Sequence, residues 1–282
     1  MIVSDCWQDY ALLEAAEGEK VERWGKYVLR RPDPQAIWRM DKPLRSRVDG
    51  FYHRSNRGGG SWEFFTNMPE RWTVSMDDLS FYVRPTGFKH TGLFPEQAAN
   101  WRFIRSHTKK GDKVLNLFAY TGGATLAALA GGADVVHVDA SKGMVAWAKE
   151  NVALSGLADR YVRFIVDDCE KFVQRELRRG NRYDGIIMDP PSYGRGPGGE
   201  MWKLEDKIFD FIRLSAQLLT DKPSFFVLNS YTTGLAPTVL KNMISLAVVP
   251  RVGGQCMADE IGLPIGNSGL VLPCGATARW EP

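Results

Sequence analysis

The chain has 282 residues, of which 44% are hydrophobic and 24% charged, values ordinary for a soluble globular protein. No apolar run is long enough for a membrane-spanning helix, and the N-terminus lacks a basic segment followed by an apolar core. We therefore expect a cytoplasmic protein without a membrane partner. The four cysteines contain no C-x-x-C pair, and no histidine has a partner at metal spacing, so we expect neither a disulfide framework nor a metal.

The formal net charge of +3 is unevenly distributed along the chain. Between Lys20 and Arg57, eleven lysines and arginines oppose four acids, which leaves a local excess of eleven minus four, or +7. Aromatic residues are interleaved with these cations, and polyanions bind such surfaces by releasing counterions. The segment is interpreted either as an RNA-binding surface or as a solvated charged face.

Residues 1–87 predict a small, β-rich, basic domain that binds the substrate. Glycine, proline, asparagine and aspartate clusters separate short runs of aromatic and β-branched residues, which is typical of strands. A helical piece is expected over 14–24. The expected strands are 27–31, 50–54, 61–65 and 81–84.

Residues 88–282 predict an α/β domain. After a helix that ends near His107, apolar β-type runs alternate with amphipathic helical runs, which favours a doubly wound, mostly parallel sheet. The last two strand-like runs have no helix between them and predict an antiparallel pair at the sheet edge. The expected strands are 114–118, 134–139, 161–166, 183–188, 224–228, 255–261 and 270–278, seven in all.

The run 183–193 predicts a buried strand that ends in an acid, two prolines and an aromatic residue. Proline cannot continue a central strand, so the chain leaves the sheet at Asp189, where open α/β sheets bind ligands. Asp189 offers a hydrogen-bond acceptor, Pro190 a free carbonyl and Tyr193 a flat face. These three candidate catalytic residues suit an enzyme that holds a nucleobase beside a cofactor; an ordinary proline turn is the alternative.

Glycines and acids follow the first three strands of the predicted α/β domain. Gly122 and Gly123 allow close backbone approach to a ligand at a helix N-terminus. Asp139 can hold both ribose hydroxyls, and Asp167 and Asp168 can accept from an adenine amino group. The third glycine of G-x-G-x-x-G is missing, so the pattern indicates a nucleoside and disfavours a nicotinamide-dependent oxidoreductase. Taken singly, each acid is equally explained as a helix cap or a surface charge.

Four motifs together resemble class I S-adenosylmethionine (SAM)-dependent methyltransferases: N-L-F-x-Y-T-G, V-D-A-S, D-D and M-D-P-P-S-Y. More closely, they resemble the large-subunit (23S) ribosomal RNA methyltransferases that modify cytosine or guanine, including the lead-in K-H-T-G-L-F-P-E-Q. The resemblance implies a Rossmann-like fold, SAM as cofactor and ribosomal RNA as substrate. The basic segment stands where that family carries an appended RNA-binding domain. The implied cofactor residues are Phe118, Tyr120, Thr121, Gly122, Gly123, Asp139, Ala140, Ser141, Asp167, Asp168 and Gln97.

Two reaction types remain open. Methylation of an exocyclic nitrogen needs an acceptor and an aromatic clamp, which Asp189 and Tyr193 supply, and we favour it. Methylation of cytosine carbon 5 needs a cysteine nucleophile. Family members with that chemistry carry an S-C-S-like run after the fifth strand, where this chain has Asn229-Ser230-Tyr231. Cys169 and Cys274 are interpreted as core thiols, the glycine-rich run 194–199 as a loop beside the site, and a noncatalytic RNA-binding protein is the remaining alternative.

Overall fold

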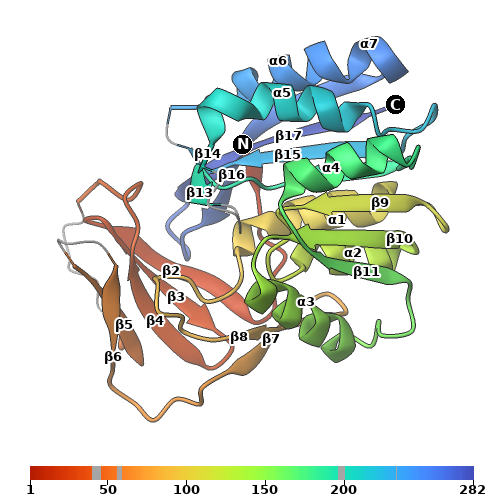
Figure 1. Cartoon of the computed structure of the whole chain (residues 1–282). Helices are drawn as coiled ribbons and strands as arrows, with labels where there is room; N and C mark the ends of the chain where they lie inside the picture. Colours follow the sequence, from red (N-terminus) through yellow and green to blue (C-terminus); the bar gives the residue numbers. More distant parts are fainter. Residues whose placement is uncertain (40–45, 56–58, 196–200, 233) are drawn as a thin grey trace. The chain divides into compact units, whose positions relative to one another are not determined.

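The computed structural model describes residues 1–39, 46–55, 59–195, 201–232 and 234–282 (Figure 1). The chain forms two compact units. The N-terminal unit comprises Ile2–Ala99 and Ile261–Cys274, and the C-terminal unit comprises Asn100–Glu260 and Gly275–Pro282 with Met1. The sequence-based boundary between residues 87 and 88 stays a prediction. It did not anticipate that a C-terminal segment belongs with the N-terminal one.

The largest sheet has the strand order β1-β16-β17-β15-β12-β9-β10-β11. The five strands from β15 to β11 pair in parallel, and β17 is antiparallel to β15. The predicted α/β fold with a mostly parallel sheet is confirmed. The described sheet has eight strands rather than seven because β1 adds in parallel to the end of β16. The bounds are β1 Ile2–Val3, β9 Lys113–Leu117, β10 Asp134–Asp139, β11 Val162–Val166, β12 Gly185–Met188, β15 Phe225–Ser230, β16 Gln255–Pro264 and β17 Val271–Glu281.

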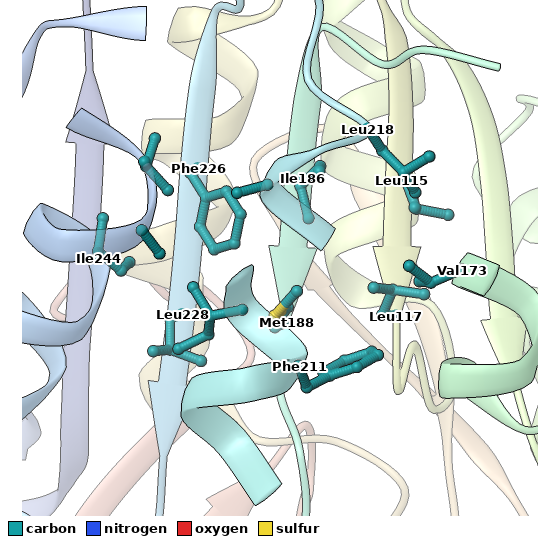
Figure 2. Packing of buried hydrophobic residues seen from close by; sticks show 14 of the residues in the cluster. Leu115, Leu117, Val173, Ile186, Met188, Phe211, Leu218, Phe226, Leu228 and Ile244 are labelled. Atoms are coloured by element: carbon teal, nitrogen blue, oxygen red, sulfur yellow. The ribbon is translucent and has the colours of Figure 1, made fainter. Parts of the chain in front are cut away.

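Helices cover both faces of this sheet. Leu115 and Leu117 of β9 join one buried core with side chains of α4, α5 and α6 (Figure 2). Between them, Asn116 points the other way and donates from Nδ2 to Thr125 Oγ1 of α2 at 3.0 Å. A strand buried on both faces explains why these runs are almost continuously apolar. The helices are η1 Pro95–Gln97, α1 Ala98–His107, α2 Gly123–Gly131, α3 Lys142–Leu154, α4 Cys169–Arg178, α5 Leu204–Ala216, α6 Pro237–Ala247 and α7 Val249–Val252.

The N-terminal unit contains a five-stranded sheet of order β2-β3-β4-β5-β6 and a separate hairpin, β7-β8. The helix expected over 14–24 is wrong, because this segment forms the last three residues of β2 and all of β3. Glu17 and Gly18 join the two strands with φ of 53° and 79°, the left-handed pair that a two-residue hairpin turn requires. The strands are β2 Tyr10–Ala16, β3 Glu19–Trp24, β4 Tyr27–Pro32, β5 Gly50–Arg54, β6 Gly60–Phe64, β7 Trp72–Met76 and β8 Leu79–Val83.

A buried ion pair stabilises the centre of this small sheet. The fully buried Glu22 accepts from Arg31 Nε at 2.7 Å, from Arg31 Nη2 at 2.8 Å and from the Tyr10 hydroxyl at 2.8 Å. Arg30 donates from Nε to Glu19 at 2.6 Å. The charge excess of the segment is therefore not all surface charge, because Arg31 lies inside the unit. Arg45, which belongs to the same segment, lies outside the described residues.

The buried carboxyl of Glu22 makes the stability of the protein depend on pH. Burial raises the pKa of its carboxyl, but the charges of Arg31 and Lys20 and the hydrogen bonds outweigh burial and lower the pKa to about 2. A carboxyl with a depressed folded-state pKa adds stability above its unfolded pKa and loses it as pH falls toward the folded value. We expect Glu22→Gln to lose about 1.5 kcal/mol at neutral pH. The difference from the parent should disappear as pH falls from about 4.5 to 2.

Urea unfolding at a series of pH values measures this difference. Glu63→Gln is the control, since Glu63 is exposed on β6. A Glu22→Gln deficit that persists unchanged at pH 2 would show that the carboxylate charge is not its cause.

Candidate active site at the carboxyl edge of the sheet

Parallel register places the sequence-predicted polar residues along one sheet edge. Met188 of β12 pairs with Leu117 of β9 and Leu228 of β15, and Leu117 pairs with Val138 of β10. The next residue of each of these four strands therefore lies beside its counterpart in the neighbouring strand. On the far side of β10, Asp167 N–H donates to the Asp139 carbonyl at 3.1 Å, which places Asp167 next to Asp139. In order across the edge they are Asn229, Asp189, Phe118, Asp139 and Asp167.

Asp139 fixes the first cofactor loop. Its Oδ2 accepts from Tyr120 N–H at 2.9 Å, and its Oδ1 accepts from Ser141 N–H at 2.8 Å. Burial raises the pKa of the Asp139 carboxyl, and these two hydrogen bonds oppose the rise. Each carboxylate oxygen keeps further acceptor capacity, so the group is held in one orientation and can still accept from a ligand.

The loop after β9 is strained. Phe118 and Tyr120 have φ of 54° and 50°, which is uncommon for bulky residues. Phe118 N–H donates to Cys169 Sγ at 3.3 Å, and Tyr120 N–H donates to Asp139. The side chain at the end of β10 and the first side chain of α4 thus hold both strained residues. Such conformations cost about 1–3 kcal/mol each and cluster at functional sites.

The N-terminus of α2 follows this loop. Gly122 is its N-cap, with φ of 91°, and supplies no side-chain cap. The first N–H groups of an α-helix have no intrahelical partner, and the helix dipole favours an anion there. Gly123 lets the helix pack tightly, because a Cβ at this position would lie 2.3 Å from Cζ2 of the buried Trp101. Thr121 is also buried, and its carbonyl accepts from Asn151 Nδ2 at 2.9 Å.

Gly123→Ala is expected to destabilise the protein by about 1–3 kcal/mol, because the methyl group must displace the Trp101 ring. Gly143→Ala in α3 is the matched control, since a Cβ there meets only Ser141 Oγ at 3.9 Å. It should be neutral or gain a few tenths of a kcal/mol from helix propensity. Thermal unfolding of both variants compares them, and equal melting temperatures would contradict the close packing at Gly123.

The other predicted cofactor residues have local structural partners. Ser141 caps α3 through its Oγ, which accepts from Met144 N–H at 3.4 Å, as the sequence indicated. Asp168 Oδ1 caps α4 by accepting from Lys171 N–H at 2.9 Å, and Asp167 is ion-paired with Arg175. The cofactor-binding roles of these three residues stay predictions, as does that of the exposed Ala140. Gln97 is buried in η1 and belongs to the N-terminal unit.

The segment after β12 is anchored by a residue that sequence reasoning missed. Trp202 donates from Nε1 to the Pro191 carbonyl at 2.7 Å, and its ring lies 5.2 Å from that of Phe118. Pro190 is buried and Tyr193 is 56% exposed, so the aromatic face is open to solvent within its own unit. Tyr193 begins β13 (Tyr193–Arg195), which pairs with β14 (Met201–Lys203). Part of the loop expected at 194–199 is thus a hairpin strand, and residues 196–200 lie outside the described part.

A buried polar network supports Asn229 beside Asp189. Asn229 Oδ1 accepts from Asn100 Nδ2 at 2.8 Å, and Asn100 Oδ1 accepts from Arg279 Nε at 2.7 Å. Thr277 donates to the same Asn100 oxygen at 3.3 Å. These partners come from α1 and β17, so no local motif could have signalled them.

Among the residues that the structure describes, no group of three or more histidine, cysteine, aspartate or glutamate side chains is arranged to hold a metal ion. None of the helices in this part of the chain is long and apolar enough to cross a membrane.

A doubly wound sheet with a strained loop, a helix N-terminus that begins at a glycine, and acids at successive strand ends defines a nucleoside-binding α/β enzyme. The family model described as S-adenosylmethionine-dependent methyltransferase matches residues 45–220, and the chain belongs to this family. A solved SAM-dependent methyltransferase from Agrobacterium tumefaciens is 36% identical, with a TM-score of 0.93, and the match covers 100% of this chain and 93% of that one.

Curated relatives carry the name ribosomal RNA large subunit methyltransferase K/L. The protein of Syntrophotalea carbinolica is 34% identical over 59% of this chain and 23% of its own length. That of Shewanella baltica is 38% identical over 50% of this chain and 18% of its own length. This chain therefore spans less than a quarter of these relatives. A solved methyltransferase complexed with SAH, SMU.776, is 20% identical over 98% of this chain and 76% of that one, with a TM-score of 0.75, and shows the shared fold.

Proposed function

We propose that this methyltransferase transfers the methyl group of SAM to a base in RNA, with ribosomal RNA as the substrate and the cytoplasm as its place of action. The main observation behind the proposal is that two aspartates with different surroundings lie at the same edge of the sheet. Asp139 is fixed by backbone donors in the cofactor loop, and Asp189 lies two strands along, at the start of an aromatic turn. The names of the curated relatives support RNA as the substrate class.

The residues at this edge fit SAM. Asp139 presents an oriented carboxylate for the ribose hydroxyls. The N–H groups at the start of α2 suit the methionine carboxylate, because helix N-termini bind anions. Gly122, with its left-handed φ, brings the backbone close to the ligand. Phe118, Tyr120 and Thr121 line the same loop, and Asp167 and Asp168 stand on the adenine side.

The chain's own groups would position the base. SAM supplies an electrophilic methyl group on a sulfonium; the protein supplies orientation and electrostatics. Asp189 would accept a hydrogen bond from an exocyclic amino group and favour loss of its proton as the new bond forms. The Pro190 carbonyl would accept a second hydrogen bond, and the exposed Tyr193 ring would stack on the base. Trp202 would keep this turn in place through the Pro191 carbonyl.

The surroundings of Cys169 indicate whether this thiol could act as the nucleophile that methylation of cytosine carbon 5 needs. Its Sγ is buried, accepts from Phe118 N–H, and lies 3.9 Å from the Val138 carbonyl. Burial raises the pKa of the thiol well above its ordinary value, opposed by the hydrogen bond from Phe118. A thiol that stays protonated is a poor nucleophile, so these observations favour nitrogen as the methylated atom.

Cys169→Ser is expected to keep methyl transfer within about threefold, because a hydroxyl can still accept from Phe118 N–H. Steady-state methylation kinetics measure the effect, and Cys274→Ser is the parallel variant. A folded, SAM-binding Cys169→Ser or Cys274→Ser protein without activity would favour carbon methylation through a displaced cysteine and contradict the role given to Asp189.

Nucleoside mass spectrometry of RNA tests the function in cells. Ribosomal RNA from cells with and without the gene is digested and compared. We expect one methylated nucleoside to disappear with the gene and to return when the gene is restored. Identical nucleoside profiles would contradict RNA as the substrate.

A further inference from the structure

The hairpin β5-β6 carries an aromatic face on the N-terminal unit. β6 is the edge strand of the five-stranded sheet, and four of its five residues are exposed. Strand alternation places Tyr52, Trp62 and Phe64 on one face, where the rings of Tyr52 and Trp62 lie 5.4 Å apart. The ring centroids of Trp62 and Phe64 are 6.1 Å apart and the ring planes are nearly parallel, with an interplanar angle of 3°.

Two glycines let these rings lie close to the sheet. A Cβ at Gly50 would come within 3.2 Å of Phe64 Cδ1, and a Cβ at Gly60 would come within 2.7 Å of Tyr52 Cε1. Trp62 is held in addition by its indole N–H, which donates to the Thr86 carbonyl at 2.8 Å. The face is therefore built and preorganised, yet Phe64 remains 51% exposed. An exposed ring this well supported is suited to stacking with another flat group.

Cations lie along the same face. Arg54 lies two residues after Tyr52 in β5, so both side chains are on the same face of the sheet. The main-chain carbonyl of Lys89 accepts a hydrogen bond from the buried Arg31 at 2.8 Å. Burial, Lys20, Arg31 and Arg54 lower the pKa of Lys89, whereas Asp33 raises it, so all four groups lie near this lysine. Lys20 is paired with Asp33, and the buried Arg31 is paired with Glu22, which leaves the two positive charges of Arg54 and Lys89 on this face.

We propose that this aromatic face, Tyr52, Trp62 and Phe64 with Arg54 and Lys89, binds a single-stranded segment of the RNA substrate. A base stacks on the Phe64 ring, and phosphates contact Arg54 and Lys89. Single-stranded nucleic acids are bound in this way, by aromatic platforms flanked by positive charge. The flat rings and the excess of positive charge favour RNA over a peptide added to the β6 edge. The inference rests on the proposed function and names the residues that hold its substrate.

Fluorescence anisotropy with a labelled single-stranded oligoribonucleotide of about ten nucleotides tests whether this aromatic face, the proposed platform, binds RNA. Phe64→Ala is expected to weaken binding about 5- to 150-fold, the range for the loss of one stacked base. The control is Phe65→Ala, because Phe65 is 53% exposed and the next residue along, on the opposite face. It should change affinity less than twofold, roughly within the effect of surface substitutions.

Charge variants give a second measurement. Arg54→Gln and Lys89→Gln should each lower the slope of log affinity against log salt by about 0.7, whereas Lys26→Gln, in the exposed β3-β4 turn, should not. Equal affinities of the Phe64→Ala and Phe65→Ala proteins would overturn the platform. So would a Phe64→Ala protein that loses self-association in sedimentation while RNA affinity is unchanged, since the face would then bind protein.

The platform and the proposed function fail in different ways. If the parent protein methylates RNA and Phe64→Ala binds RNA as tightly as the parent, the platform is wrong and the function stands. If the parent protein neither binds nor methylates RNA, the proposed function itself is wrong. SAM affinity of all variants should match the parent and serves as the folding control.

Discussion

Asp139→Ala is expected to weaken SAM binding about a hundredfold. Loss of a hydrogen bond that involves a charged group costs about 1.5–3 kcal/mol, which is roughly ten- to a hundredfold in affinity. The larger value is expected because Asp139 has a second task. Without its Oδ2, the strained Tyr120 loses the acceptor that holds it at a φ of 50°. The variant therefore loses both a ligand contact and the shape of the loop.

Calorimetric titration with SAM measures this change. Asp134→Ala is the matched control, because Asp134 is the first residue of the same strand, β10, and is exposed at its opposite end. We expect the control to bind SAM like the parent. An Asp139→Ala protein that binds SAM as tightly as the parent would show that the cofactor does not bind at this edge of the sheet.

Asp189→Ala is expected to lower kcat by about 10²- to 10⁴-fold, the usual contribution of a positioned acid–base group. SAM affinity should stay close to that of the parent, because Asp139 rather than Asp189 fixes the cofactor loop. The loss should appear mainly in kcat and less in KM, since the contact with the amino group matters most as its proton leaves. Tyr193→Ala should instead raise KM, because stacking stabilises the bound and the reacting base alike.

Single-turnover methyl transfer with saturating SAM separates these effects. Asp221→Ala is the control, since Asp221 is exposed in the loop that precedes β15, at the other end of that strand. An Asp189→Ala protein with parent-like turnover, or one that has lost SAM binding altogether, would contradict the role assigned to this acid.

The α/β unit was predictable because its signals are local. A buried parallel strand is a short apolar run, and the acid or proline after it marks its end, as at Asp139 and Asp189. The N-terminal unit was less predictable. The Glu17-Gly18 turn sits between two runs whose spacing of charges and apolar residues also suits a helix, and only pairing with β4 decides between the two.

The support of the site was not predictable from sequence. Trp202 acts through Pro191, 11 residues earlier, and Asn100 acts through Asn229, 129 residues later. Nothing at the positions of Trp202 and Asn100 marks these roles. Cys169 was correctly interpreted as a core thiol, but its hydrogen bond to the strained Phe118 depends on how β9 and α4 come together. Sequence also could not show that Arg31 of the basic segment is paired with the buried carboxylate of Glu22.

Transfer of labelled methyl from SAM to protein-free ribosomal RNA by the purified protein shows directly whether an RNA base is methylated. The RNA is digested to nucleosides, and mass spectrometry identifies the labelled one. We expect label on the base of one nucleoside, present with the parent protein and absent with Asp189→Ala. Label confined to protein, or no label in RNA although SAM is bound, would contradict this expectation.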